Sequence, residues 1–149
     1  MIIFLDIYGV LCSPIFIDDC SGYCQIERFE AVMRDYPDWE IVISSGMREK
    51  KSLSDLKELF SADIAARIVG VTPAIGLSIK HCGQHEIERY LYSIGKASAP
   101  WVALDDMASQ FEDGLDNLVL CNMSAGLDEN AALRLREKLT LRTNIAKFF

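Results

Sequence analysis

Five short apolar runs recur along the chain, and stretches with helical spacing separate them. The runs cover residues 2–5, 40–43, 68–71, 101–104 and 117–121. They are rich in valine and isoleucine, and most lack the alternation of apolar and polar positions that a half-exposed strand has. Such runs are typical of strands in a parallel sheet that is covered on both faces.

Helical spacing predicts four helices, at residues 26–36, 53–60, 87–94 and 128–139. Pro37 is expected to end the first helix, Ser52 to cap the start of the second, and Gly95 to end the third. The tail after residue 139 predicts either a short amphipathic helix or a fraying end.

Strands that alternate with helices predict an α/β fold, a doubly wound parallel sheet with right-handed crossovers. The length of 149 residues suits one domain over residues 1–149, with no internal repeat or linker. Residues 12–22 are the least patterned part of the chain, and we expect them to form a loop beside the functional site.

Composition excludes several classes of function. No apolar run approaches the ~20 residues of a membrane span, and Asp6 interrupts the first run too early for a signal peptide. The net charge of −7 disfavours nucleic acid as a general partner without excluding recognition of a single phosphate. Five cysteines lack the density of a disulfide scaffold, so we expect a reduced, cytoplasmic setting.

Polar residues follow three of the predicted strands at their carboxyl ends. Asp6 ends the first, Ser44 and Ser45 end the second, and Asp105 and Asp106 end the fourth. Ligands bind beyond these ends in open α/β sheets. If the first strand is central and has the other two as neighbours, all these groups meet in one crevice.

Three carboxylates in one crevice repel each other, so protons or a cation must compensate them. An oxygen-rich cluster of this kind suits Mg²⁺, which keeps several waters and readily bridges to a phosphate. A zinc site is not indicated, because Cys20 and Cys24 lack a second pair of ligands at a useful spacing. For each aspartate alone, a role as a helix cap or turn former is the alternative.

Three segments resemble a known family. "FLDIYGVL", "IVISSGMR" and "WVALDD" look like the first, second and fourth motifs of the haloacid dehalogenase-like (HAD) hydrolases. "IVGVTP", "EIERYL" and a late "GL" are similar to the small HAD domains of Swiss-Army-Knife RNA-repair-type proteins. The resemblance implies a Rossmannoid core with strand order 5-4-1-2-3 and no large cap domain.

The resemblance also implies a Mg²⁺-dependent phosphatase mechanism. Asp6 would be the nucleophile and would form an aspartyl-phosphate. Asp6, Asp105 and the backbone carbonyl of Tyr8 would hold Mg²⁺, and Asp106 would bind the metal or its water.

The second and third motifs supply further candidates by resemblance. Ser44 would hydrogen-bond a phosphoryl oxygen, with Ser45 as the alternative. A basic residue before the third helix would neutralise charge in the transition state. That motif is poorly matched, and Lys80 is the candidate, with His81 and His85 as substitutes.

The residue types of Gly9, Arg48 and Asp113, which lie near the motifs, suggest roles at the site. Gly9 permits a sharp turn after the first strand and a close approach of backbone amides to an anion. Arg48, in the basic cluster "GMREKK", could reach a phosphate from the start of a helix. Asp113 could join the acidic cluster, although a turn role before Gly114 fits equally well.

Tyr8 stands where HAD phosphatases normally carry a second aspartate, which protonates the leaving group and later activates water. With an ordinary pKa near 10, a tyrosine is a poor base at neutral pH. Three interpretations follow, in order of preference: a phosphatase-like hydrolase, a degenerate domain that binds a phosphorylated ligand or protein partner, and a 2-haloacid dehalogenase. The last shares the form "D-x-Y-G" and releases a halide, which needs no proton.

The spacing of the strands leaves little room for a cap. Residues 7–39 and 72–100 each accommodate one predicted helix, whereas haloacid dehalogenases carry a sizeable helical cap. An open site suits a phosphate on a small molecule or on a macromolecule, with the partner supplying the cover.

Overall fold

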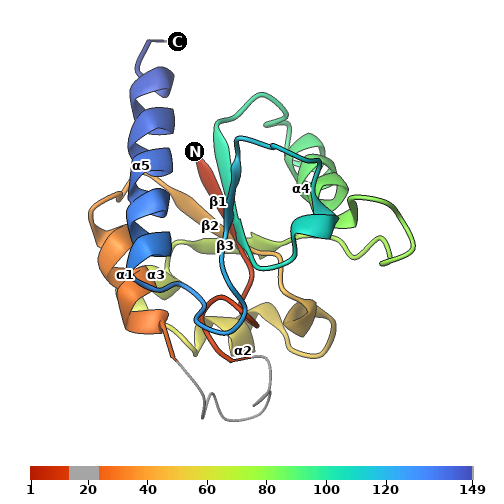
Figure 1. Ribbon diagram of the computed structural model, residues 1–149, viewed down its shortest axis with the longest axis horizontal. Coiled ribbons are helices and arrows are strands. Elements are labelled where there is room, and N and C mark those ends of the chain that lie inside the picture. Colours follow the sequence, from red (N-terminus) through yellow and green to blue (C-terminus); the bar gives the residue numbers. More distant parts are fainter. Residues whose placement is uncertain (14–23, 149) are drawn as a thin grey trace.

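The apolar runs form one parallel sheet in the computed structural model, which describes residues 1–13 and 24–148 (Figure 1). The strands are β1 (Ile2–Leu5), β2 (Glu40–Ile43), β3 (Ile68–Val71), β4 (Trp101–Asp105) and β5 (Leu118–Leu120). Their order in space is β3-β2-β1-β4-β5. The predicted α/β class and strand order are therefore confirmed.

The central position of β1 determines where the functional groups meet. Leu5 pairs with Ile43 of β2 on one side and with Leu104 of β4 on the other. The residues that follow these three strands therefore emerge side by side at one edge of the sheet.

Helices cover both faces of the sheet (Figure 1). The elements are α1 (Ile26–Arg34), α2 (Leu53–Lys57), α3 (Ala62–Ala65), α4 (Cys82–Ser93) and α5 (Glu129–Ala146), with short 3₁₀ turns η1 (Gly46–Glu49) and η2 (Ala108–Gln110). Side chains of α1, α2, α3 and α5 pack against the sheet in one buried cluster. Those of α4 pack in a second cluster with Phe4 and Val42. Both faces of β1, β2 and β4 are buried, as their apolar runs predict, whereas the edge strands β3 and β5 are partly exposed at Val69 and Leu120.

Local signals at the helix ends agree with the structure. Ser52 forms a reciprocal capping box with Asp55 at the start of α2. Gly95 follows α4 with a φ of 69°, a left-handed conformation that glycine adopts without strain.

The second predicted helix is shorter than its apolar stripe. It ends at Lys57, and a separate short helix, α3, follows. The buried Glu30 of α1 causes the break, because its carboxylate accepts hydrogen bonds from the backbone amide and the hydroxyl of Ser61, both at 2.7 Å. These bonds draw the chain out of the α2 path before α3 begins.

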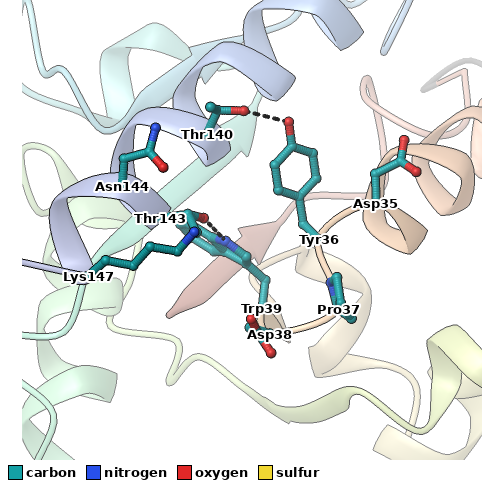
Figure 2. Close-up of a pocket in the computed structure, with 9 residues that line it drawn as sticks. All are labelled: Asp35, Tyr36, Pro37, Asp38, Trp39, Thr140, Thr143, Asn144 and Lys147. Carbon is teal, nitrogen blue, oxygen red and sulfur yellow. Dashed lines mark hydrogen bonds between the residues drawn. The ribbon is translucent and has the colours of Figure 1, made fainter.

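The last helix continues well beyond residue 139, so the tail is neither frayed nor a separate helix. The hydroxyl of Tyr36 lies 2.7 Å from Thr140 Oγ1, and Trp39 Nε1 donates to Thr143 Oγ1 at 2.9 Å. Figure 2 shows both rings reaching from the α1–β2 connection toward α5. These hydrogen bonds hold the end of α5 against the body of the protein.

Two further expectations concern the connections. The predicted loop at residues 12–22 lies mostly outside the described residues, which include only Cys12 and Ser13 of it. Across residues 1–13 and 24–148, no inserted cap domain separates the strands, and none of the helices has the length and apolar character needed to traverse a bilayer.

Candidate active site

Three carboxylates converge at the carboxyl ends of β1 and β4. Asp6 directly follows β1, Asp105 is the last residue of β4, and Asp106 follows it. Because Leu5 pairs with Leu104, Asp6 emerges beside Asp105. One oxygen from each of the three carboxylates lies within 4.8 Å of the others.

Backbone hydrogen bonds fix the directions of two of these side chains. The amide of Asp6 donates to the carbonyl of Leu104 at 3.0 Å, which continues the β1–β4 ladder by one residue. The carboxylate of Asp6 accepts from the amide of Ile7 at 2.7 Å, and that of Asp105 accepts from the amide of Met107 at 2.8 Å. Both carboxylates are therefore oriented before any ligand binds.

Gly9 makes room for the third carboxylate. Its φ is 78°, and a Cβ built on it would lie 2.2 Å from Asp106 Oδ2. The backbone turn after β1 and the close approach of Asp106 thus both require glycine at this position.

Burial and mutual repulsion raise the pKa values of the buried carboxyl groups. Desolvation raises the pKa of Asp6 well above its ordinary value, and the charges of Asp105 and Asp106 raise it further. Burial raises the pKa of Asp105 to about 7, and the charge of Asp106 adds to this effect, whereas the amide of Met107 opposes it. The ion pairs found between described residues involve none of these three aspartates.

The donor set suits a hard divalent cation. All the converging atoms are carboxylate oxygens, which Mg²⁺ and Ca²⁺ prefer over the nitrogen and sulfur ligands typical of zinc. A bound cation would also supply the compensation that the neighbouring side chains do not. The residues present therefore fit the Mg²⁺ that the sequence predicts at the carboxyl ends of these strands.

The carboxylates open into a cavity of about 700 Å³. Sequence reasoning predicted six of its lining residues: Asp6, Tyr8, Ser44, Arg48, Asp105 and Asp106. It did not predict the others that bear on the chemistry: Glu49, Leu77, Glu86, Met107, Gln110 and Met123.

Other candidates lie away from the cavity lining. Ser45 is fully buried, and its hydroxyl caps η1 by accepting from the amide of Met47. Lys80 is exposed and does not line the cavity. His85 is exposed, and its Nδ1 lies 3.3 Å from Glu88 Oε2.

The remaining candidates have structural surroundings of their own. His81 precedes α4 and has the left-handed φ of 53°. Asp113 is exposed and is not part of the acidic cluster. Among the described residues that line the cavity, the only basic side chain is that of Arg48.

Arg48 lines the cavity, but its charge is already matched. Its Nη2 lies 2.8 Å from Glu86 Oε2, and both side chains are less than a tenth exposed. Its Nη1 and Nε donate to the carbonyls of Ser44 and Thr72, each at 2.9 Å. A glutamate on a helix is usually solvated, so nothing in the sequence near Glu86 signals this pairing.

Comparison with known proteins gives one match. A family model described as "HAD domain in Swiss Army Knife RNA repair proteins" matches residues 2–132. The matched region contains the three converging aspartates and every residue that lines the cavity. No curated protein and no solved structure matches the chain.

Proposed function

The chain belongs to the family of HAD domains in Swiss Army Knife RNA repair proteins, and from that premise we propose that it is a Mg²⁺-dependent phosphatase. The observation that carries the proposal is that Asp6, Asp105 and Asp106 converge, with one oxygen of each within 4.8 Å of the others, in the lining of a cavity. Such a cluster, with no ion pair to a lysine or arginine among residues 1–13 and 24–148, is a strong candidate for a divalent cation and for phosphoryl chemistry.

The reaction would proceed in two displacements at phosphorus. A carboxylate oxygen of Asp6 attacks the phosphorus, and the bond to the ester oxygen breaks, so that the leaving group departs with the electron pair. Water then attacks the phosphorus of the aspartyl-phosphate, breaks its bond to Asp6 and releases inorganic phosphate. Solvent accepts the proton that the attacking water loses and supplies the proton that the leaving group gains.

The roles of the other groups follow from their positions. Asp6, Asp105 and Asp106, with the backbone carbonyl of Tyr8, would hold Mg²⁺, which when bound neutralises charge on the phosphoryl oxygens. Ser44 lines the cavity beside Asp6 and would donate a hydrogen bond to a phosphoryl oxygen.

Tyr8 determines which leaving groups react fastest. It lines the cavity, and a phenol is generally a poorer substitute than a carboxyl group in acid–base catalysis at neutral pH. Esters of phenols, whose anions depart without prior protonation, should therefore react faster than esters of alkyl alcohols.

The test is hydrolysis of 4-nitrophenyl phosphate with and without Mg²⁺. We expect activity that EDTA removes and that Asp6→Asn abolishes, whereas the matched variant Asp113→Asn, at an exposed carboxylate outside the cluster, keeps it. Activity that persists in Asp6→Asn would refute Asp6 as the nucleophile. Metal-independent chloride release from 2-chloropropionate would instead identify a dehalogenase.

A second candidate function is binding of a phosphorylated ligand without turnover, and Tyr8 is the observation that favours it. Tyr8→Asp separates the two functions. For a phosphatase we expect this variant to raise turnover by about tenfold or more, because general acid–base catalysis contributes ~10²–10⁴-fold. An unchanged rate in a folded variant, together with Mg²⁺-dependent binding of phosphate, would support the binding domain.

A further inference from the structure

The mouth of the cavity carries exposed apolar side chains. Leu77, Met107 and Met123 line the cavity with 83%, 47% and 54% of their surfaces exposed. They come from three connections, after β3, β4 and β5 respectively. Thioether and aliphatic groups so arranged favour a ligand with an apolar or aromatic face.

The same cavity is strongly acidic. Among the described residues, five carboxylates line it, those of Asp6, Glu49, Glu86, Asp105 and Asp106, against one basic side chain, that of Arg48, which pairs with Glu86. One bound divalent cation would still leave two negative charges uncompensated. Residues 14–23, which the structure does not describe, contain no lysine or arginine.

Glu49 differs from the other carboxylates that line the cavity. It is exposed, it lies outside the three-aspartate cluster, and no ion pair between described residues involves it. Glu49 and the apolar side chains line the same cavity as the three aspartates, so they are available to contact the rest of a substrate whose phosphoryl group would lie at the aspartates.

Building on the proposed phosphatase, we propose that its substrates are small phosphate monoesters whose leaving group is partly apolar and carries no negative charge, with cationic leaving groups favoured. The volume of about 700 Å³ lies in the range of small-ligand sites, roughly 300–1,000 Å³. A polynucleotide end fits the site poorly, because its neighbouring phosphodiesters would approach the same uncompensated carboxylates.

The test compares kcat/KM for three aryl phosphates that differ in one substituent: phenyl, 3-carboxyphenyl and 3-(trimethylammoniomethyl)phenyl phosphate. We expect the carboxylate to lower kcat/KM relative to the phenyl ester by about tenfold and the ammonium group to raise it. A nucleoside 5′-monophosphate should likewise be hydrolysed faster than a 5′-phosphorylated oligoribonucleotide.

Variants separate the effect of the protein from the intrinsic reactivity of each ester. Glu49→Gln should narrow the ratio of kcat/KM between the cationic and anionic esters several-fold, because the variant removes a negative charge that attracts the cationic group and repels the anionic one. Glu137→Gln, an exposed carboxylate on α5 that does not line this cavity, should leave the ratio unchanged.

The apolar contribution has its own pair of variants. Leu77→Asn should reduce the preference for 1-naphthyl over phenyl phosphate about threefold, as expected for lost apolar contact area. Leu133→Asn, which removes an exposed leucine of α5, should leave that preference intact.

Each outcome is decisive. Equal kcat/KM for the three esters, an insensitive ratio in Glu49→Gln, or faster hydrolysis of the oligonucleotide end would overturn the proposal. If no ester is hydrolysed, the proposed phosphatase function fails instead. The selectivity is then measured from Mg²⁺-dependent binding of the same esters by calorimetry, where tighter binding of the carboxyphenyl ester would refute it.

Discussion

The pH dependence of stability measures how strongly the site disfavours ionised carboxylates, through burial first and through their mutual repulsion second. The pKa of Asp105 is raised by burial and by Asp106, to about 7 from an ordinary value of 3.8. Between these two values the folded protein holds a proton that the unfolded chain has released. The stabilisation from this group is therefore complete below about pH 4 and is lost as the pH rises through 7.

The size of the effect follows from the two pKa values. For Asp105 alone, the free energy of unfolding of the metal-free protein should fall by about 2–3 kcal/mol between pH 5 and pH 8. Asp6, whose pKa is also raised, acts in the same direction. Asp55, Asp63 and Asp116 have lowered pKa values, so their contributions change only below about pH 4 and do not enter this window.

Asp105→Asn removes the titrating group while keeping an oxygen that can accept from the amide of Met107. Urea unfolding in EDTA should give this variant less than half the pH slope of the unsubstituted protein, and a higher stability at pH 8 by about 1–3 kcal/mol. Asp113→Asn, at an exposed carboxylate, should keep the full slope.

Mg²⁺ should reverse the loss of stability at high pH. At ten times its dissociation constant, Mg²⁺ adds about 1.4 kcal/mol to the unfolding free energy at pH 8, and in Asp105→Asn it should add much less. A stability that is flat from pH 5 to pH 8, or a slope that survives in Asp105→Asn, would show that burial and the neighbouring carboxylates do not raise the pKa of Asp105.

Two further substitutions test the surroundings of the cluster. Gly9→Ala should destabilise the fold by about 2–3 kcal/mol and weaken Mg²⁺ binding, because the alanine Cβ would meet Asp106 and the residue has a positive φ. Gly46→Ala is the control, because a Cβ at that position has open space. Equal urea midpoints for the two variants would contradict this expectation. Arg48→Met should lower the free energy of unfolding by about 3–5 kcal/mol, because Glu86 is then buried without its partner. The double variant Arg48→Met with Glu86→Met should lose less stability than the two single variants added together. Strictly additive losses in urea unfolding would disprove the coupling.

Elements with local causes were predicted well from the sequence. The strands could be located from their apolar runs, and these runs reflect the burial of both faces in β1, β2 and β4. The cap at Ser52 and the turn at Gly95 depend on residues close in the chain. The convergence of Asp6 with Asp105 and Asp106 followed from the topology, since parallel neighbours end at one edge. The sheet order therefore carried the prediction of the acidic cluster.

Helix ends that depend on contacts between residues far apart in the chain could not be predicted from local sequence patterns. The break between α2 and α3 depends on Glu30 and Ser61, 31 residues apart. The extension of α5 depends on Trp39 and Thr143, 104 residues apart. Neither hydrogen bond leaves a local pattern, and helical periodicity alone places both helix ends incorrectly.

The charge balance of the site is the most consequential property that local patterns conceal. "GMREKK" reads as a basic cluster that could bind phosphate, yet Glu86, 38 residues away, matches the charge of Arg48 inside the protein. Lys80 is exposed and does not line the cavity. A cavity that appears basic from its nearest sequence is therefore acidic in the fold. In the proposed function, a bound cation would therefore supply the positive charge that a phosphoryl group needs, because the only basic side chain among the described residues that line the cavity is that of Arg48, which is paired with Glu86.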